Sequence, residues 1–508
     1  MTDRRQPKAL LYILYFFFSV AFMSCGGHKI PENFWESDEL PQIYPDYADV
    51  TVPVNIAPLT FQMDGKADDV VARLVAGGEE IVCGGHKIQP DADDWKRLVG
   101  LAKGDAIKVE VYVEQNGSWT RFKPFHIYVS PDSIDPYISY RLIPPSYVTY
   151  EELTINQRCL ENYDESIIYD NMLCSEGTQG QCINCHNYQQ YNPERMQFHA
   201  RQNLGGTVIA YDGTIKKINM RNDSILSAGV YPTWHPWLPL IVYSTNMTSQ
   251  IFHSVNPNKI EVFDSESDLI AYDVEKNEVA NIENDPAEME CFPFWAPDGK
   301  TLYYCSAHFE YDDTITDKAK EFITRTQEAK YNLYKKSFNP ETLQFGPREL
   351  VFAADSLDKS ATLPRVSPDG RYLMFTVAKY GVFHIWHHDA DLWMLDLQTG
   401  EVRNMEEINS ADTESYHSWS SNGKWVVFSS RRYDSNYTRP FIAHIDAKGH
   451  GSKPFELPCA NPDNHRQLLK SYNIPEFMQG PVTIKPQRFA DVLKQEAKPV
   501  KYVNRLSK

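Results

Sequence analysis

Apolar and polar residues alternate with a period of two along much of the chain, which predicts β-strands and few helices. Between residues 50 and 130 the clearest alternating runs are 52–56, 59–63, 106–113 and 125–129. Asn116-Gly117 between two of these runs indicates a hairpin turn, and Gly77-Gly78 indicates another. We expect this segment to form a small β-sandwich, immunoglobulin-like in the loose sense, that spaces or binds.

A pattern of a large apolar residue, a turn and an apolar strand occurs four times after Gly205. The four copies are 234–244, 295–305, 366–376 and 419–429. Asp-Gly or Asn-Gly in three of them supplies the positive φ angles of a tight turn, and each copy is followed by another apolar strand. Repeated antiparallel units of this kind predict the blades of a β-propeller.

The copies begin 61, 71 and 53 residues apart, which is longer than ordinary blades of about 40–45 residues. Insertions therefore project from the ring, including a charged helical stretch over 317–330. The hairpin 207–220 predicts a further blade, and C-terminal residues are candidates to complete another. We expect five to seven blades.

The N-terminus has the features of an export signal. Arg4, Arg5 and Lys8 precede an apolar run over 9–23, which is too short to span a bilayer comfortably, and Cys25 follows. These features predict a lipoprotein signal in which the Cys25 thiol is acylated. A plain secretory signal with an incidental Cys25 is the alternative.

The predicted organisation has six parts. They are a signal peptide (1–24), a tether (25–49), the β-sandwich (50–130), a loop-rich connector with short helices (131–204), the propeller (205–460) and a C-terminal extension (461–508).

Charge and cysteine content narrow the function classes. The formal net charge of −18 over 508 residues argues against a nucleic-acid partner, whose phosphates would be repelled. Export places the cysteines in an oxidising compartment. Cys159 with Cys174 and Cys291 with Cys305 are the closest candidate disulfides, and buried free thiols are the alternative.

The connector contains the one motif with a specific chemistry, Cys182-Ile-Asn-Cys185-His186. In C-x-x-C-H the two thiols add to the vinyl groups of haem, and the histidine becomes the proximal iron ligand. A zinc site would need further ligands nearby, and a redox disulfide would need a thioredoxin-like βαβ context. We therefore predict one covalent haem c.

The second axial ligand is less determined by the sequence. Residues 192–201 predict a helix opened by Pro193, on which Met196 and His199 share a face. We favour His199 slightly over Met196 as the distal iron ligand, and a five-coordinate haem is the third option.

Several motifs together resemble a known family. Besides Cys182–His186, they are Met196-Gln-Phe-His-Ala-Arg, Gly-Gly-Thr at 205–207 and Gly-Val-Tyr-Pro-Thr-Trp-His-Pro at 229–236. Over about residues 137–477 the chain resembles Bacteroidota lipoproteins in which a TolB-like β-propeller accompanies a single c-type haem motif. The resemblance implies no catalytic residue, and it leaves the biochemical role open.

Other polar residues lie in the repeat loops, notably His384, His387 and His388. They are candidates for a second metal or substrate site, or for hydrogen bonds that fix the turns between blades. No nucleophile elbow, P-loop or dinucleotide fingerprint is present.

Three functions are compatible with these features. The first is a lipid-anchored electron-transfer haem protein whose propeller docks a redox partner. The second is a propeller that binds an envelope protein or glycan and carries a structural or sensing haem. The third is a haem enzyme with an open axial position, although we favour a stand-alone enzyme less than the other two functions. Because no acidic run follows Cys25, we place the anchor in the outer membrane, facing the periplasm.

Overall fold

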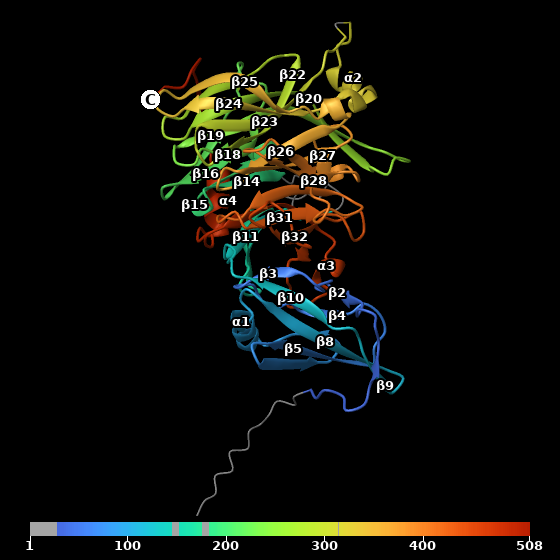
Figure 1. Cartoon of the computed structure of the whole chain (residues 1–508). Helices are drawn as coiled ribbons and strands as arrows, with labels where there is room; N and C mark the ends of the chain where they lie inside the picture. Colours follow the sequence, from blue (N-terminus) through green and yellow to red (C-terminus); the bar gives the residue numbers. More distant parts are fainter. Residues whose placement is uncertain (1–27, 145–151, 175–181, 313, 508) are drawn as a thin grey trace, which may run out of the picture.

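The computed structural model describes residues 28–144, 152–174, 182–312 and 314–507 and is mainly β (Figure 1). Its strands form a small N-terminal domain and a larger ring of sheets, in agreement with the predicted fold class. None of the described helices is both long and apolar enough to cross a membrane. Cys25 and the apolar run before it lie outside the described residues.

The N-terminal domain packs a seven-stranded and a three-stranded sheet over one apolar core. Its elements are β1 Trp35–Glu36, β2 Ile43–Tyr44, β3 Thr51–Pro53, β4 Phe61–Met63, β5 Asp69–Ala76, β6 Glu79–Gly84, β7 Lys87–Ile88, α1 Ala92–Leu101, β8 Ala106–Gln115, β9 Ser118–Arg121 and β10 Phe125–Ser130. The predicted turns at Gly77-Gly78 and Asn116-Gly117 connect β5 to β6 and β8 to β9.

Two features of this domain differ from the prediction. Helix α1, which the sequence analysis did not anticipate, is capped by the Asp91 carboxylate and buries Trp95 in the core. The predicted tether is partly folded, because β1 pairs with β9 and Tyr44 and Tyr47 are buried. We therefore correct the domain start to about residue 35.

The ring is a propeller of six four-stranded blades within the described chain. The strands of each blade are given from the innermost outward. The first three blades are blade 1 with β34 Ser471–Met478, β11 Tyr137–Ile143, β12 Thr154–Cys159 and β13 Glu165–Asp170; blade 2 with β14 Ile183–Gln189, β15 Asn192–Ala200, β16 Gly206–Tyr211 and β17 Thr214–Asn219; and blade 3 with β18 Gly229–Trp234, β19 Leu240–Phe252, β20 Ile260–Asp273 and β21 Glu278–Glu283. The other three are blade 4 with β22 Glu288–Trp295, β23 Thr301–His308, β24 Asn332–Asn339 and β25 Gln344–Phe352; blade 5 with β26 Ser360–Val366, β27 Tyr372–Ala378, β28 Asp391–Asp396 and β29 Val402–Asn404; and blade 6 with β30 Glu414–Trp419, β31 Trp425–Ser430, β32 Arg439–His444 and β33 Phe455–Glu456.

Blade 1 closes the ring with strands from both ends of the propeller sequence. β34 pairs antiparallel with β11, so that Tyr137 lies opposite Met478. The predicted boundaries at 204 and 460 are corrected accordingly, because the connector supplies β11–β15 and the C-terminal extension supplies β34. The loop-rich description of 131–204 fails because strands of this segment bury their polar residues, such as Asn156, Gln157 and Gln197, together with their apolar ones.

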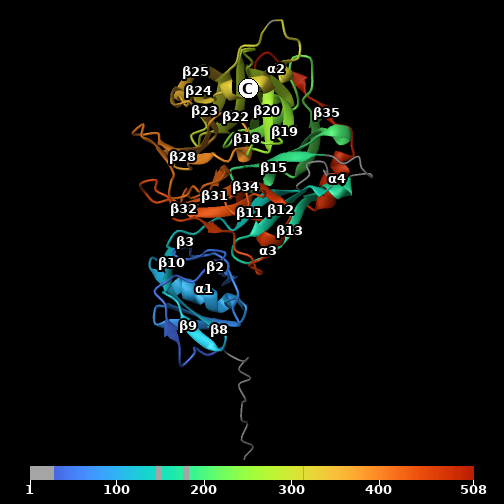
Figure 2. The ribbon, with the colours of Figure 1, turned by 90° about the vertical axis from the view of Figure 1, so that its right-hand side faces the viewer.

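The rest of the C-terminal segment lies along the outer edges of the blades. Helix α4 (Pro486–Leu493) packs against β13, β16 and β17 (Figure 2). β35 (Lys498–Pro499) then pairs with β17, and β36 (Lys501–Tyr502) pairs with β21. The predicted helical insertion in blade 4 contains α2 (Lys318–Thr324).

The N-terminal domain and the propeller share one apolar core, which includes Trp425 and Phe477. The buried segment after β33, with α3 (Asn464–Gln467), joins them. There the Cys459 thiol lies 3.5 Å from Nε2 of His465, whose Nδ1 contacts Glu456. Burial opposes ionisation of Cys459, but the charges of His465 and Arg158 outweigh it and lower the thiol pKa to about 7.

All eight described cysteines are free thiols. Cys291 and Cys305 lie opposite each other in β22 and β23, and Cys159 pairs in register with Tyr137. The disulfide prediction for both pairs is therefore wrong, and the alternative of free thiols is confirmed for the described residues.

Ring closure through β34 gives a stability prediction. Phe477 is 1% exposed, whereas Leu469, just before the strand, is 63% exposed. Phe477→Ala should lower the free energy of unfolding by about 3–5 kcal/mol because it leaves a cavity in the shared core. Urea unfolding followed by tryptophan fluorescence measures this, with Leu469→Ala as the matched control. Equal effects of the two substitutions would contradict the closure.

Candidate functional site

The innermost strands of the six blades line a central channel, and each contains one β-bulge. The bulge residues have φ between 48° and 55°, the left-handed region; they are Cys185, Tyr231, Phe292, Leu363, Tyr416 and Ile474. In each strand the ladder register shifts at this residue. A bulge inserts one extra residue and re-aims the side chains near it.

The C-x-x-C-H motif lies on this repeat. Cys185 is the bulge residue of blade 2, and His186 follows it on β14. In the other five blades the residue after the bulge is Pro232, Pro293, Pro364, His417 and Pro475. The propeller therefore places Cys185 and His186 in the channel, at a position where proline is the usual residue.

His186 is completely enclosed. Its side chain is 1% exposed, and it borders a small cavity in the channel together with Cys185. Neither ring nitrogen forms a hydrogen bond of normal geometry with the described residues. Burial lowers the imidazole pKa to about 3, with a smaller contribution from Arg141. The ring is therefore neutral at physiological pH, which is the form that binds metals.

Cys182 lies beside a larger cavity of about 320 Å³ at one mouth of the channel. Tyr231 and Tyr416 border both this cavity and the one next to His186, so the two are neighbours. Cys182 is partly exposed and Cys185 is buried, and burial raises the pKa of the Cys185 thiol. The Cys182 thiol thus borders one cavity, and Cys185 and the neutral His186 ring border the cavity next to it.

The larger cavity has aromatic walls and basic groups. Tyr231, Tyr416, Phe383 and Trp386 contribute its aromatic rings. Its charged residues are Arg141, Arg201 and Arg431, and the described lining contains no Asp or Glu.

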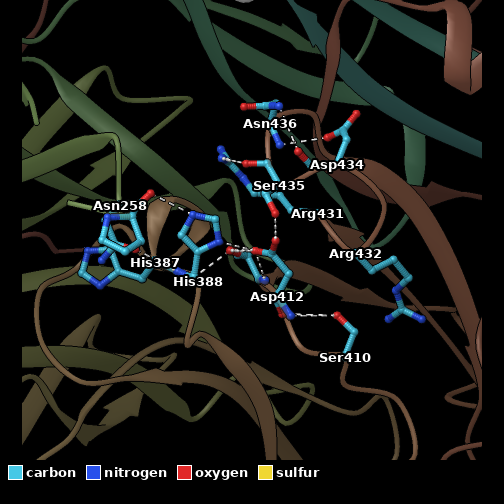
Figure 3. A network of polar contacts seen from close by, with 12 residues as sticks. Asn258, His387, His388, Ser410, Asp412, Arg431, Arg432, Asp434, Ser435 and Asn436 are labelled. Atoms are coloured by element: carbon cyan, nitrogen blue, oxygen red, sulfur yellow. Dashed lines mark hydrogen bonds and ion pairs between the residues drawn. The ribbon is translucent and has the colours of Figure 1, made fainter. Parts of the chain in front are cut away.

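A long hairpin forms one side of the cavity mouth. β19 and β20 extend beyond their blade, and Thr248, Gln250 and Val262 of this hairpin line the cavity. The hairpin loop reaches blades 5 and 6, where the His388 N–H donates to Asn258 at 3.1 Å and His388 Nδ1 lies 2.7 Å from Asp412 (Figure 3). The hairpin is therefore fixed across the ring.

The other propeller histidines serve mainly as contacts between elements. His387 Nε2 lies 3.1 Å from Glu261 of β20, and His384 contacts Thr362 and the Gly381 carbonyl. Among the described residues no group of three or more His, Cys, Asp or Glu side chains is arranged to hold a metal ion. The contacts of these histidines agree with the second of the two predictions, that they form hydrogen bonds that fix the turns between blades.

Met196 and His199 do not lie on a helix, because residues 192–200 form β15. The helix prediction is wrong because Met196, Phe198 and Ala200 alternate with polar residues and enter the core between blades 1 and 2. His199 lies between Phe198 and Ala200, so its side chain points to the opposite face of the strand, where Nδ1 lies 3.0 Å from Thr207 Oγ1. His199 lines neither of the two cavities that border the motif; it lines a third, which shares Arg201 with the larger cavity.

The residues of the motif fit the chemistry of a c-type haem. The thiols form no disulfide, the imidazole forms no hydrogen bond of normal geometry with the described residues, and the neighbouring larger cavity combines flat apolar walls with cations that suit propionates. A zinc site fits less well, because zinc takes three or four protein ligands, and the described residues around the motif contain no group of three His, Cys, Asp or Glu side chains arranged to hold a metal ion.

Comparisons with known proteins give a fold likeness alone. No protein-family model matches the chain, and a search of curated proteins finds no match. Among solved structures, TolB from Acinetobacter baumannii has a TM-score of 0.42 and 13% identity over 76% of this chain and 85% of that chain. The periplasmic gluconolactonase PpgL from Pseudomonas aeruginosa has a TM-score of 0.32 and 10% identity over 68% and 100%.

A third solved structure, prolyl oligopeptidase B from Galerina marginata, has a TM-score of 0.36 and 8% identity over 69% of this chain. This chain spans 42% of the oligopeptidase. None of these likenesses assigns a role to a residue of this chain.

Sequence reasoning missed that the end of the C-x-x-C-H motif is also a propeller repeat. A Pro or His two residues before a large apolar residue recurs in every blade, as in His186-x-Tyr188 and Pro475-x-Phe477. This spacing was the available sign of blade 1 and of the innermost strand of blade 2, whose outer strands the predicted hairpin 207–220 had indicated. Arg201 is the last residue of the motif that begins at Met196, but no sequence pattern linked it to Arg141 and Arg431, because the three come from separate blades.

The repeat position gives a prediction for His186. His186→Pro should fold with a free energy of unfolding within about 1 kcal/mol of wild type, because four other blades carry proline there. Circular dichroism and urea unfolding measure this. A loss of several kcal/mol would show that His186 is needed for the blade itself.

The equivalent histidine of blade 6 gives a pH prediction. Burial, with a contribution from Arg365, lowers the pKa of His417 to about 3 from an ordinary value of 6.5. Between these pH values the unfolded chain binds a proton that the folded chain does not, so stability falls as pH falls, by about 1.4 kcal/mol per unit for this group. His417→Gln should make unfolding less sensitive to acid below pH 6.5, measured by urea unfolding across pH. An unchanged slope would contradict the burial of a neutral ring.

Proposed function

We propose that this protein is a c-type haem protein of the cell envelope. Cys182 and Cys185 would form the thioether links, and His186 would be the proximal iron ligand. The observation that carries the proposal is the buried His186 ring, whose two nitrogens lack hydrogen-bond partners of normal geometry beside the Cys185 thiol. A buried polar group without a partner costs free energy, so a ligand for it accounts for its position.

A bound haem would supply one-electron chemistry, and the chain's own residues would set its surroundings. Burial keeps His186 neutral and able to ligate, and the bulge at Cys185 directs the motif into the channel. The aromatic walls would exclude water from one face of the ring.

Electron transfer is the role we propose first. The cavity beside Cys182 lies at the channel mouth, which gives a haem edge a route to a partner docked on the propeller face. The N-terminal sequence supports export, an acylated Cys25 and an outer-membrane anchor facing the periplasm, the compartment type in which c-type haem is attached.

One observation favours a second function. Within the described lining of the larger cavity there is neither Met nor His, and Met196 and His199 lie elsewhere. The smaller cavity, which His186 borders, also has no Met and no second His in its described lining. A haem held by His186 would then suit a sensor or enzyme that binds a small molecule.

The test is expression with the native signal and a c-type maturation system, followed by absorption spectra and a pyridine haemochrome after denaturation. We expect one covalent haem. A low-spin spectrum would favour electron transfer, and a high-spin spectrum would favour the sensor or enzyme. Cys182→Ala/Cys185→Ala should lose all covalent haem, and His186→Pro should lose the axial ligand. Cys83→Ala, a buried thiol in the N-terminal domain, is the matched control and should keep full loading.

Absence of covalent haem in wild-type protein after competent maturation would refute the proposal. A low-spin spectrum that reverts to high spin in His199→Ala or Met196→Ala would restore one of these residues as distal ligand and favour electron transfer alone.

A further inference from the structure

The larger cavity concentrates positive charge in a protein whose formal net charge is −18. Its three arginines come from β11, from the segment after β15 and from the segment after β31. Among the described residues, Arg141 and Arg201 form no ion pair with a carboxylate, and the described lining contains none. Guanidinium groups without an ion-pair partner, as in Arg141 and Arg201, are a usual basis for binding an anion.

The two unpaired arginines are held in position by neutral groups. Arg141 donates from Nη1 to the Ile183 carbonyl at 2.6 Å and from Nη2 to Asn473 at 2.8 Å. Nε of Arg141 is buried and has no partner among the described residues. Arg201 Nε and Nη2 lie 3.2 and 2.9 Å from the Asn184 amide, with its oxygen turned toward them.

The nearest acidic group to Arg201 is already engaged. Asp264 is buried and accepts hydrogen bonds from Asn246 at 2.7 Å and Thr248 at 2.6 Å. It therefore satisfies polar groups of β19, and although its charge acts on Arg201, the two form no ion pair.

The third arginine belongs to an aromatic wall. The Arg431 guanidinium stacks over Trp386 at 4.4 Å from the ring centre. Together with Tyr231, Tyr416 and Phe383, this wall offers flat surfaces around the basic groups. Flat surfaces beside guanidinium groups suit a planar organic molecule that carries carboxylates.

We infer that this cavity is a carboxylate-binding site in which Arg141 and Arg201 hold the acid groups of a flat organic ligand against the aromatic walls. The carboxylates have two sources. The first is the propionates of a haem attached at Cys182 and Cys185, and this case rests on the proposed function. The second is a free aromatic acid, and this case is independent of the proposed function.

The test uses Cys182→Ala/Cys185→Ala protein, which cannot attach haem covalently. It is titrated with ferric protoporphyrin IX, with the dimethyl ester of that porphyrin and with naphthoate, and binding is followed by quenching of tryptophan fluorescence. Trp386 in the cavity wall is the expected reporter.

We expect the diacid porphyrin, naphthoate or both to bind, with the diacid at least about tenfold tighter than its ester. Arg141→Gln and Arg201→Gln should each weaken binding by about tenfold, the effect of losing a charge-assisted hydrogen bond. Arg201→Lys should retain part of the affinity. Arg371→Gln is the control, because Arg371 pairs with Asp396 away from the cavity.

Arginine-dependent binding of the porphyrin diacid alone assigns the site to haem propionates, and arginine-dependent binding of naphthoate assigns it to free acids. Equal affinity for diacid and diester, with no effect of either arginine substitution and no naphthoate binding, would overturn the inference. Because these titrations need no covalent haem, a wild-type protein that fails to load haem refutes the proposed function without affecting this result. If Arg141→Gln does not fold, the affinities of Arg201→Gln and Arg201→Lys for the same ligands decide whether the cavity binds carboxylates.

Discussion

Every innermost strand of the propeller depends on one residue held in the left-handed region of backbone space. For residues other than glycine this conformation is uncommon, and for the β-branched Ile474 it is strained. Such strain persists when the surrounding packing determines the backbone, and here neighbouring blades pack on both sides of each bulge. The common bulge also makes the six strands present equivalent positions to the channel, so a chemically unusual residue at one of them faces the centre of the ring.

The channel and the long β19–β20 hairpin together make one enclosed environment. The hairpin starts in blade 3 and is held to blades 5 and 6 through His387 and His388, so it spans part of the mouth and not only its own blade. Aromatic rings then surround guanidinium groups whose counter-charges are absent from the described lining. Low polarity and unbalanced charge in the same small volume raise the strength of electrostatic interactions there.

The sequence predicted the parts of the fold that depend on local chemistry. Turns such as Asp298-Gly299 and Asn422-Gly423 need particular residues, and they revealed blades 4 to 6. Blade 2 has one such turn, Asp212-Gly213, which gave the hairpin predicted over 207–220. Blade 1 has no such turn among its described residues, and its pairing of Tyr137 with Met478 joins residues more than 300 positions apart, which no short-range pattern reports. Over 192–200, a spacing of three between Met196 and His199 suggested a helix, although the alternation from Met196 to Ala200 was the decisive pattern.

Closure by β34 sets an order of events during biogenesis. Residues 471–478 emerge last among the propeller strands, and until they pair with β11 the ring is an open arc. In the closed ring Cys185 and His186 are 2% and 1% exposed, out of reach of any enzyme that would modify them. Any covalent modification of this thiol must therefore be made while the chain is still incompletely folded, and the last strand then seals the modified residue inside.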